Sequence, residues 1–123
     1  MKSGALILVI DDDPYMREIT RVHLEGAGYE VALAATAADG LDKARSLRPS
    51  VVIMDFAMPG GSGAEALRDL RNDHAIGQVP VLMVTAWSLE ESQAKTAEFG
   101  ATWLQKPIMA ERLIDSVREL AAV

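Results

Sequence analysis

The sequence predicts a single α/β domain built on an open, doubly wound parallel sheet with helices on both faces. Five apolar runs alternate with five amphipathic stretches along the chain, which is the pattern of successive strand–helix units with right-handed crossovers. A length of 123 residues suits one domain and is about half of what an eightfold barrel requires. No linker or low-complexity stretch interrupts the chain, so we expect one domain over residues 1–123, without an effector domain.

The first unit combines a buried strand with a well-marked helix start. Residues 5–10 form a continuous apolar run, typical of a strand that is covered on both faces. Asp13 and Pro14 predict the helix start, with Asp13 as the N-cap and Pro14 at the first helical position. The helix is expected to end near Gly28, and His23 on its apolar stripe is expected at a core or boundary position.

The second unit is weaker in its strand and clearer in its helix. Residues 29–33 are predicted to form the second strand. Thr36 and Asp39 have the spacing of a capping box with Asp in place of Glu, and Pro49 ends the helix that follows.

Three further units complete the alternation, with strands predicted at residues 51–54, 80–84 and 102–104. A loop rich in Gly and Pro, residues 58–63, leads from the third strand into the third helix. Ser88 and Glu91 have capping-box spacing for a fourth helix that ends near Gly100. Apolar residues between Leu113 and Leu120 mark the last helix.

Composition excludes several classes of function. The chain has no cysteine, which excludes a disulfide framework, a zinc–thiolate site and a cysteine nucleophile. His23 and His74 are far apart in sequence, so a histidine-rich metal site is disfavoured. A formal net charge of −6 disfavours direct binding to nucleic acid. No apolar run approaches the ~20 residues of a membrane span, so we expect a cytoplasmic protein that does not contact the membrane.

Polar side chains gather where the predicted strands end. Asp11 and Asp12 follow the first strand, and Asp55 follows the third. The carboxyl ends of parallel strands share one edge of the sheet, with neighbouring strands ~4.8 Å apart, so these carboxylates should converge. They would repel one another unless a cation neutralised them. Oxygen ligands alone favour a hard cation, and the small number of protein oxygens favours Mg²⁺ over Ca²⁺.

Two further residues extend the chemistry of this edge. Thr85, after the fourth strand, offers a hydroxyl group, and Lys106, after the fifth, offers a positive charge. Carboxylates with Mg²⁺, a lysine and a hydroxyl group are a suitable set for binding a phosphoryl group.

These residues resemble the receiver domain of two-component response regulators over essentially the full chain. The matching segments are residues 9–14, residues 53–59 with Gly63, residues 84–86, and residues 100–101 with Lys106 and Pro107. The resemblance implies a flavodoxin-like fold like that of chemotaxis regulators, with the strands in the order second, first, third, fourth, fifth. Each segment is weak by itself, but together and in order, at the predicted strand ends, they are specific.

The resemblance also implies how the site works. Asp55 would accept a phosphoryl group from a sensor histidine kinase or a phosphotransfer protein, which makes the chain a signalling domain rather than an enzyme. Mg²⁺ would be held by the side chains of Asp11, Asp12 and Asp55 and by the carbonyl of Ala57. Thr85 and Lys106 would contact the phosphoryl oxygens, with a cis peptide bond before Pro107. Thr85 and Trp103 would act as the switch residues.

A downstream protein partner would bind the face formed by the fourth helix, the fifth strand and the last helix, near residues 87–103. Two positions depart from the family pattern. Ala57 stands where a polar residue is common, and Trp87 stands where smaller or polar residues are common. We expect these two side chains to alter the rate of dephosphorylation.

Two other functions fit the same fold class less well. A Mg²⁺-dependent phosphohydrolase with an aspartate nucleophile would need a second acid two residues after Asp55, where Ala57 stands. A flavodoxin-like cofactor binder would need a hydroxyl- and Gly-rich phosphate loop after the first strand, where the aspartates at 11–13 would repel phosphate.

Overall fold

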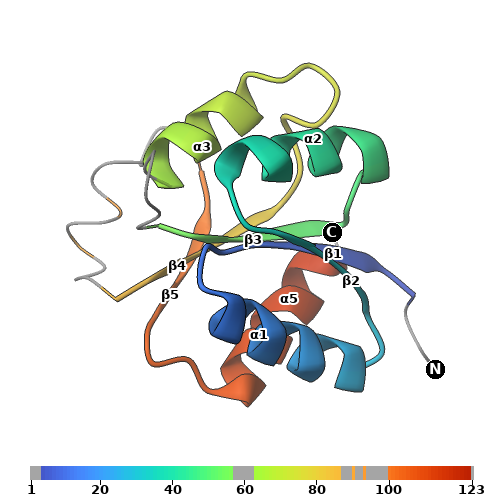
Figure 1. Cartoon of the computed structure of the whole chain (residues 1–123), viewed down its shortest axis with the longest axis vertical. Coiled ribbons are helices and arrows are strands. Elements are labelled where there is room, and N and C mark those ends of the chain that lie inside the picture. Colours follow the sequence, from blue (N-terminus) through green and yellow to red (C-terminus); the bar gives the residue numbers. More distant parts are fainter. Residues whose placement is uncertain (1–3, 57–62, 87–89, 91–92, 94–99, 123) are drawn as a thin grey trace.

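The protein is a single five-stranded parallel sheet with helices on both faces (Figure 1). The computed structural model describes residues 4–56, 63–86, 90, 93 and 100–122. The strands lie in the order β2-β1-β3-β4-β5, which confirms the predicted fold class and strand order. Their bounds are β1 Leu6–Ile10, β2 Glu30–Ala34, β3 Val51–Asp55, β4 Val81–Thr85 and β5 Thr102–Gln105.

The helices form two layers, one on each side of the sheet. In Figure 1 the helices α2 (Ala37–Leu47) and α3 (Gly63–Arg71) lie above the sheet, and α1 (Pro14–Gly26) and α5 (Ala110–Ala121) lie below it. The helix expected to begin near Ser88 lies largely outside the described residues. No described helix has the length and apolar character needed to cross a bilayer.

The alternation of side chains along the strands divides the core into two layers. In β1, Leu8 and Ile10 pack on the side of α2 and α3, whereas Ile7 and Val9 pack on the side of α1 and α5. The strands β3 and β4 are buried throughout, as expected for the centre of a sheet covered on both faces. The rigid centre of the sheet therefore supports the edge at which β1 and β3 end.

Two of the predicted helix starts have the expected caps. The Oδ1 atom of Asp13 accepts hydrogen bonds from the backbone N–H groups of Tyr15 (2.9 Å) and Met16 (3.4 Å). The helix begins at Pro14, as predicted. At α2, the Oγ1 atom of Thr36 accepts a hydrogen bond from the N–H group of Asp39 at 3.1 Å.

The strands β3 and β4 end at Asp55 and Thr85, the residues expected at their ends, and backbone hydrogen bonds account for both. The N–H group of Phe56 donates to the carbonyl of Val84 at 2.8 Å, so β3 continues through Asp55. The N–H group of Lys106 donates to the carbonyl of Thr85 at 2.7 Å, so β4 includes Thr85. The N–H group of Tyr29 instead donates to a carbonyl of α1, and β2 begins one residue later than expected.

His23 corrects one expectation. The residue is exposed rather than at a core or boundary position, although it contributes to the lining of a cavity beside α1. Its neighbour Leu24 occupies the buried position on the helix. Because adjacent helical residues point in directions about 100° apart, burial of Leu24 turns His23 toward solvent.

Candidate functional site

Three carboxylates meet at the carboxyl edge of the sheet. One oxygen each from Asp11, Asp12 and Asp55 can be chosen so that all three lie within 4.8 Å of one another. Asp11 and Asp55 are buried, with 8% and 9% of their surface exposed, whereas Asp12 is open to solvent. The predicted convergence of these side chains is therefore confirmed, with one carboxylate facing the solvent.

The turn between β1 and α1 holds two of these carboxylates in place. The N–H group of Asp11 donates to the carbonyl of Ala34 at 3.0 Å, which continues the pairing of β1 with β2. The Oδ1 atom of Asp11 accepts a hydrogen bond from the N–H group of Asp13 at 2.9 Å. Because Asp13 also caps α1, the acidic turn and the helix start form one hydrogen-bonded unit.

The electrostatics of the site are unfavourable for a set of bare carboxylates. Burial raises the pKa of Asp11 above its ordinary value, and the nearby Asp55 and Asp12 carboxylates raise it further. The hydrogen bond from Asp13 and the charge of Lys106 act in the opposite direction. The net effect is a raised pKa, which means that the charged form of Asp11 is less stable here than in water.

Lys106 brings a positive charge to this edge from the end of β5. Its Nζ atom lies 3.6 Å from the Oδ2 atom of Asp55. The peptide bond between Lys106 and Pro107 is cis, as the resemblance led us to expect. The lysine side chain is 26% exposed, so it reaches the site from its rim.

Thr85 ends β4 and is fully buried, with 0% of its surface exposed. Its carbonyl accepts the hydrogen bond from the N–H group of Lys106, so the ends of β4 and β5 are tied together. Asp55 lies opposite Val84 in the pairing of β3 with β4, which places Thr85 one residue beyond Asp55 along the sheet. Thr85 and Lys106 therefore lie on the same edge as the acidic side chains.

The donor set fits a small, hard cation. The three carboxylates supply oxygen ligands alone, and their mutual repulsion would be relieved by a divalent charge. The exposure of Asp12 leaves one side of the group open to solvent, which suits an ion that retains water ligands. The fourth expected ligand, the carbonyl of Ala57, lies outside the described residues.

An aromatic pair lies directly beside the site. The ring centroids of Phe56, which follows Asp55, and Trp103, in β5, are 5.4 Å apart at an interplanar angle of 61°. Such edge-to-face geometry is favourable for aromatic rings. Trp103 is half-buried and packs against the core layer on the side of α2 and α3. Trp87 lies outside the described residues.

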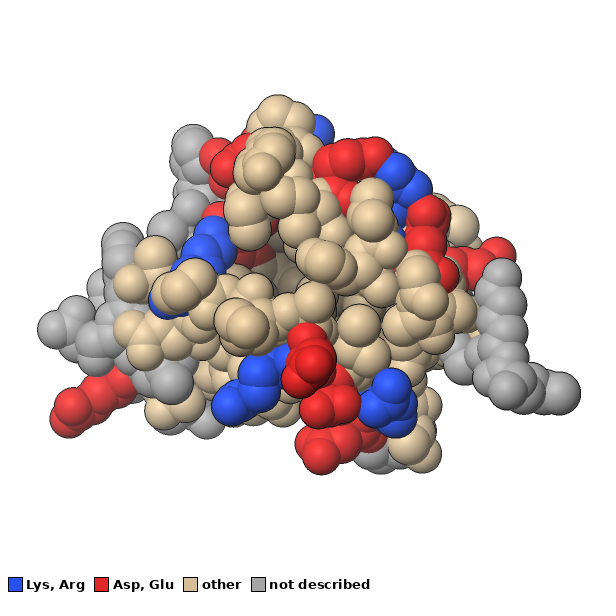
Figure 2. Space-filling model, turned by 90° about the horizontal axis from the view of Figure 1, so that it is seen from below, with Lys and Arg blue, Asp and Glu red and all other residues tan. Residues whose placement is uncertain are grey.

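A small apolar cavity adjoins the site on the side of α1 and α5. It has a volume of about 60 Å³ and is lined by Asp11, Asp55 and Lys106 together with apolar side chains such as Ile19 and Leu113. Figure 2 views the molecule from this side and shows a hollow bordered by groups of acidic and basic side chains. The apolar lining accounts for the loss of hydration that raises the pKa of Asp11.

Two arginines make contacts with backbone carbonyls that were not predicted, one at this edge of the sheet and one at the opposite edge, where β4 and β5 begin. The Nη1 atom of Arg17 donates a hydrogen bond to the carbonyl of Asp11 at 2.7 Å. Arg71, at the end of α3, donates to the carbonyls of Gly77, Val79 and Gly100 at 3.1, 2.7 and 2.9 Å. A sequence pattern offers little signal for such contacts, because arginine is also the usual residue of an exposed helical face.

Comparison with known proteins identifies the family. Residues 7–118 match the family model described as "Response regulator receiver domain". The chain belongs to this family. Members are signalling domains that interact with histidine kinases or phosphotransfer proteins, and the phosphohydrolase alternative is not favoured. Members also generally bind Mg²⁺ at an acidic pocket, and in this chain Asp11, Asp12 and Asp55 form a cluster of carboxylates.

Similar proteins differ in length. Protein PilH of Pseudomonas aeruginosa is 34% identical over 119 residues, which cover 96% of this chain and 98% of that protein. The DNA-binding dual master transcriptional regulator RpaA of Synechocystis is 34% identical over 115 residues, or 93% of this chain but 48% of that protein. This chain thus spans about half the length of RpaA. The crystallised chemotaxis protein CheY4 of Vibrio cholerae has a TM-score of 0.89 and 33% identity, with 96% of this chain and 99% of that chain covered.

Proposed function

We propose that this receiver domain accepts a phosphoryl group on Asp55 in a reaction that depends on Mg²⁺. The observation that carries the proposal is the convergence of the Asp11, Asp12 and Asp55 carboxylates, with Lys106 3.6 Å from Asp55. Asp55 is the member of this group that the lysine contacts, and it ends a central strand whose position the whole core supports. These features favour Asp55 as the residue that accepts the phosphoryl group. They favour Asp11 and Asp12 as further residues that bind the metal ion.

The transfer is a displacement at phosphorus. A carboxylate oxygen of Asp55 forms the new bond to phosphorus while the bond from phosphorus to the donor's imidazole nitrogen breaks, and the nitrogen keeps the electron pair. Bound Mg²⁺, held by Asp11, Asp12, Asp55 and the carbonyl of Ala57, would supply charge neutralisation for the acidic acceptor and the anionic donor. Lys106 and the Thr85 hydroxyl group would then stabilise the phosphoryl oxygens through hydrogen bonds.

The same residues would pass the signal to the surface. Thr85 ends β4, and its carbonyl accepts a hydrogen bond from the N–H group of Lys106. A shift of either residue toward a phosphoryl group would therefore move the end of β5. Trp103 in β5 contacts Phe56, the residue after the acceptor. We therefore propose Thr85 and Trp103 as the switch residues.

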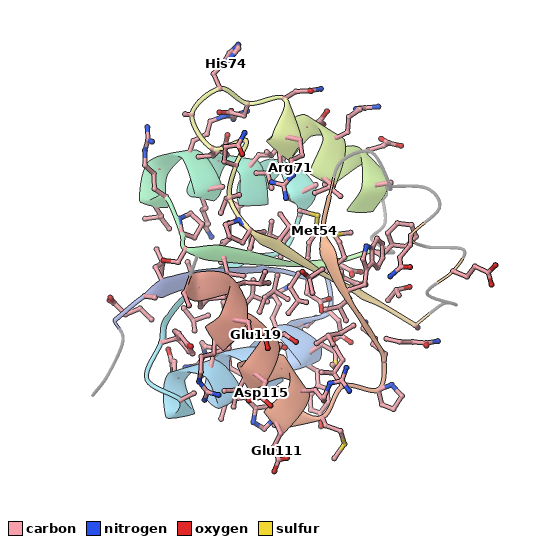
Figure 3. All side chains as sticks on the ribbon, turned by 180° about the vertical axis from the view of Figure 1, so that it is seen from behind. Met54, Arg71, His74, Glu111, Asp115 and Glu119 are labelled. Carbon is pink, nitrogen blue, oxygen red and sulfur yellow. The ribbon has the colours of Figure 1, made fainter. Side chains whose placement is uncertain are left out.

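We further propose that the output partner binds the β5 and α5 side of the molecule, together with the fourth helix. Three exposed acidic residues, Glu111, Asp115 and Glu119, follow one another at one-turn spacing along α5 (Figure 3). Asp115 is paired with Arg118 at 3.0 Å, and the remaining excess of acidic charge on this helix favours a partner with a basic surface. A triple substitution to Gln should weaken partner binding and make it less sensitive to salt.

Intact mass measurement tests the phosphoacceptor proposal. Wild-type protein, Asp55→Asn and Asp11→Asn are each incubated with acetyl phosphate, with Mg²⁺ or with EDTA. We expect a gain of one phosphoryl group in the wild type with Mg²⁺, none in Asp55→Asn, and a strongly reduced gain in Asp11→Asn or in EDTA. A full gain in Asp55→Asn, or in the wild type with EDTA, would overturn the proposed site.

A further inference from the structure

Arg17 has an unusual place among the charged residues of α1. Its Nη1 atom donates a hydrogen bond to the carbonyl of Asp11 at 2.7 Å, so the guanidinium group reaches back from the helix over the acidic turn. Within the part of the chain that the structure describes, Arg17 forms no ion pair. Arg21, one turn further along, pairs with both Glu18 and Glu25.

The turn has several hydrogen bonds besides the one that Arg17 donates. The N–H group of Asp11 is bonded to Ala34 at 3.0 Å, and that of Asp13 is bonded to the Asp11 carboxylate at 2.9 Å. The Asp13 side chain accepts two further backbone hydrogen bonds, and the N–H group of Arg17 itself bonds to the carbonyl of Asp13 at 2.9 Å. The distinctive contribution of the Arg17 side chain is therefore its charge rather than the geometry of the turn.

We propose that Arg17 is a built-in counter-cation of the carboxylate group formed by Asp11, Asp12 and Asp55. Together with Lys106, it offsets the repulsion between these carboxylates before any metal ion binds. A cation in this place also repels an incoming divalent ion, so Arg17 lowers the affinity of the site for Mg²⁺. The inference rests on the proposed metal site and adds a residue that sets how tightly that site binds its ion.

The size of the effect follows from Coulomb's law. Charges interact appreciably when they are closer than a Debye length, which is about 10 Å at 0.1 M salt. At such a distance in water, the repulsion between one positive charge and a divalent ion raises the Kd for that ion by roughly threefold to tenfold. Loss of the hydrogen bond to the Asp11 carbonyl destabilises the metal-free and the metal-bound forms alike, so it should change the affinity for Mg²⁺ little. Removal of the Arg17 charge should therefore tighten Mg²⁺ binding rather than weaken it.

Calorimetric titration with Mg²⁺ at low salt tests the proposal. Arg17→Gln removes the charge, and Arg21→Gln removes the same charge from the next turn of the same helix, where two glutamates already neutralise it. We expect the Kd of Arg17→Gln for Mg²⁺ to fall about threefold to tenfold and that of Arg21→Gln to stay within about twofold of the wild type. The difference should shrink in 0.5 M NaCl. An unchanged or higher Kd in Arg17→Gln would overturn the inference.

A second measurement avoids the metal altogether. In EDTA, Arg17→Gln should lower the denaturant midpoint, and this loss should be smaller in an Asp12→Asn background, where one repelling carboxylate is gone. An equal loss in both backgrounds would contradict the counter-cation role. Failure of the wild type to bind Mg²⁺ would overturn the metal site and this inference together, whereas binding with the same Kd in Arg17→Gln would overturn this inference alone.

Discussion

The Nζ atom of Lys106 lies 3.6 Å from the Oδ2 atom of Asp55, across the carboxyl edge of the sheet. Asp55 ends β3 and Lys106 follows β5, and β4 lies between these two strands. The contact therefore depends on the length of the lysine side chain. The charge of Lys106 is the structural feature that most directly distinguishes Asp55 from the other carboxylates of the site.

Replacement of Lys106 tests its part in the reaction. Lys106→Met should slow phosphorylation by acetyl phosphate about tenfold or more, because the transferred group loses a positive charge beside it. Mg²⁺ binding should not weaken, since a cation near the metal site has been removed. A time course by intact mass at saturating Mg²⁺ measures the rate, with Arg112→Met as a control for loss of an exposed positive charge. An unchanged rate in Lys106→Met would exclude a direct role.

Neutralisation of Asp11 should stabilise the metal-free protein. Burial raises the pKa of Asp11, so the folded state binds a proton more readily than the unfolded state and loses stability as the pH rises through this range. The Asn side chain in Asp11→Asn carries no charge, so stability no longer falls with rising pH at this position. Its amide oxygen can still accept the hydrogen bond from the N–H group of Asp13. In EDTA near pH 7 its Tm should exceed that of the wild type by a few degrees, and the difference should vanish near pH 3.

Exposed Asp69 provides the control for this experiment, because Asp69→Asn removes the same charge far from the acidic group. Its Tm in EDTA should stay close to that of the wild type. Saturating Mg²⁺ should raise the Tm of the wild type and should raise that of Asp11→Asn much less. Equal stabilisation by Asp69→Asn and Asp11→Asn would show that only net charge matters.

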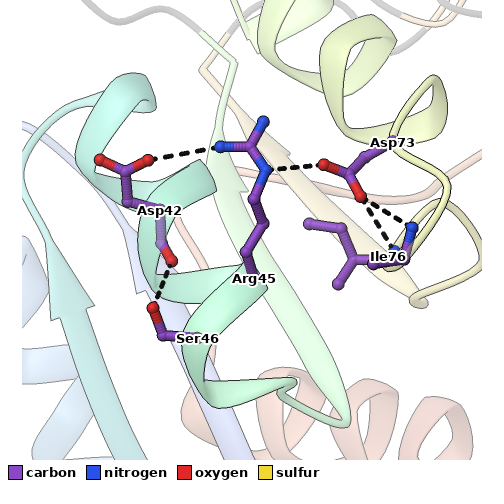
Figure 4. A network of polar contacts seen from close by, with 6 residues as sticks. Asp42, Arg45, Ser46, Asp73 and Ile76 are labelled. Carbon is purple, nitrogen blue, oxygen red and sulfur yellow. Dashed lines mark hydrogen bonds and ion pairs between the residues drawn. The ribbon is translucent and has the colours of Figure 1, made fainter.

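A charged contact joins α2 to the loop after α3, and it should make stability depend on pH in the opposite direction. The Nε atom of Arg45 lies 2.7 Å from the Oδ2 atom of Asp73 (Figure 4). The other carboxylate oxygen of Asp73, Oδ1, accepts hydrogen bonds from the N–H groups of Ala75 and Ile76. These contacts, Arg45 first, hold the pKa of Asp73 below its ordinary value. The stabilisation is therefore present above the ordinary pKa of aspartate and is lost as the pH falls through the lowered value.

Asp73→Asn tests that contact. The substitution should lower the Tm near pH 7 and should have a smaller effect near pH 2, because more of the wild-type Asp73 carboxylate is protonated there. Arg45→Met should reproduce the loss near pH 7. Thermal melts across the pH range measure both, and a loss of the same size at both pH values would contradict the linkage to Asp73.

Gly63 should tolerate no side chain. A Cβ atom there would lie 2.6 Å from the Cα atom of Phe56 and 2.8 Å from its carbonyl oxygen. The N–H group of Gly63 donates to that same carbonyl at 2.6 Å, so backbone would have to move away from Asp55. We expect Gly63→Ala to cost about 1–3 kcal/mol in the free energy of unfolding. Gly26→Ala, where a Cβ atom meets nothing within 4 Å, should be neutral or slightly stabilising in the same denaturant titration.

Much of this architecture was predictable because it depends on local chemistry. The apolar runs, the Asp13 cap and the glycines identify the described elements to within a residue or two, since strand and helix periodicities differ. The convergence of Asp11, Asp12 and Asp55 follows from one rule, that parallel strands end at the same edge. The start of β2 shifted by one residue because the N–H group of Tyr29 donates to a carbonyl of α1, which no side-chain pattern indicates.

The long side chains were not predictable in the same way. Arg17, Arg45 and Arg71 all lie on helices, where a sequence pattern shows them simply as polar positions. Their partners are backbone carbonyls or a distant carboxylate, and each contact depends on the packing of two elements and on a rotamer. The exposure of His23 was not predicted because only one of two adjacent helical residues faces the core here, and that residue is Leu24.

The most direct test of the phosphoacceptor site is to locate the modified residue chemically. Protein phosphorylated with acetyl phosphate and Mg²⁺ is treated with borohydride, which reduces an aspartyl phosphate to homoserine, and is then digested and sequenced by mass spectrometry. The proposed site predicts homoserine at position 55 and unmodified aspartate at positions 11 and 12. Homoserine at position 11 or 12, or unmodified Asp55 in protein that carries a phosphoryl group, would contradict it.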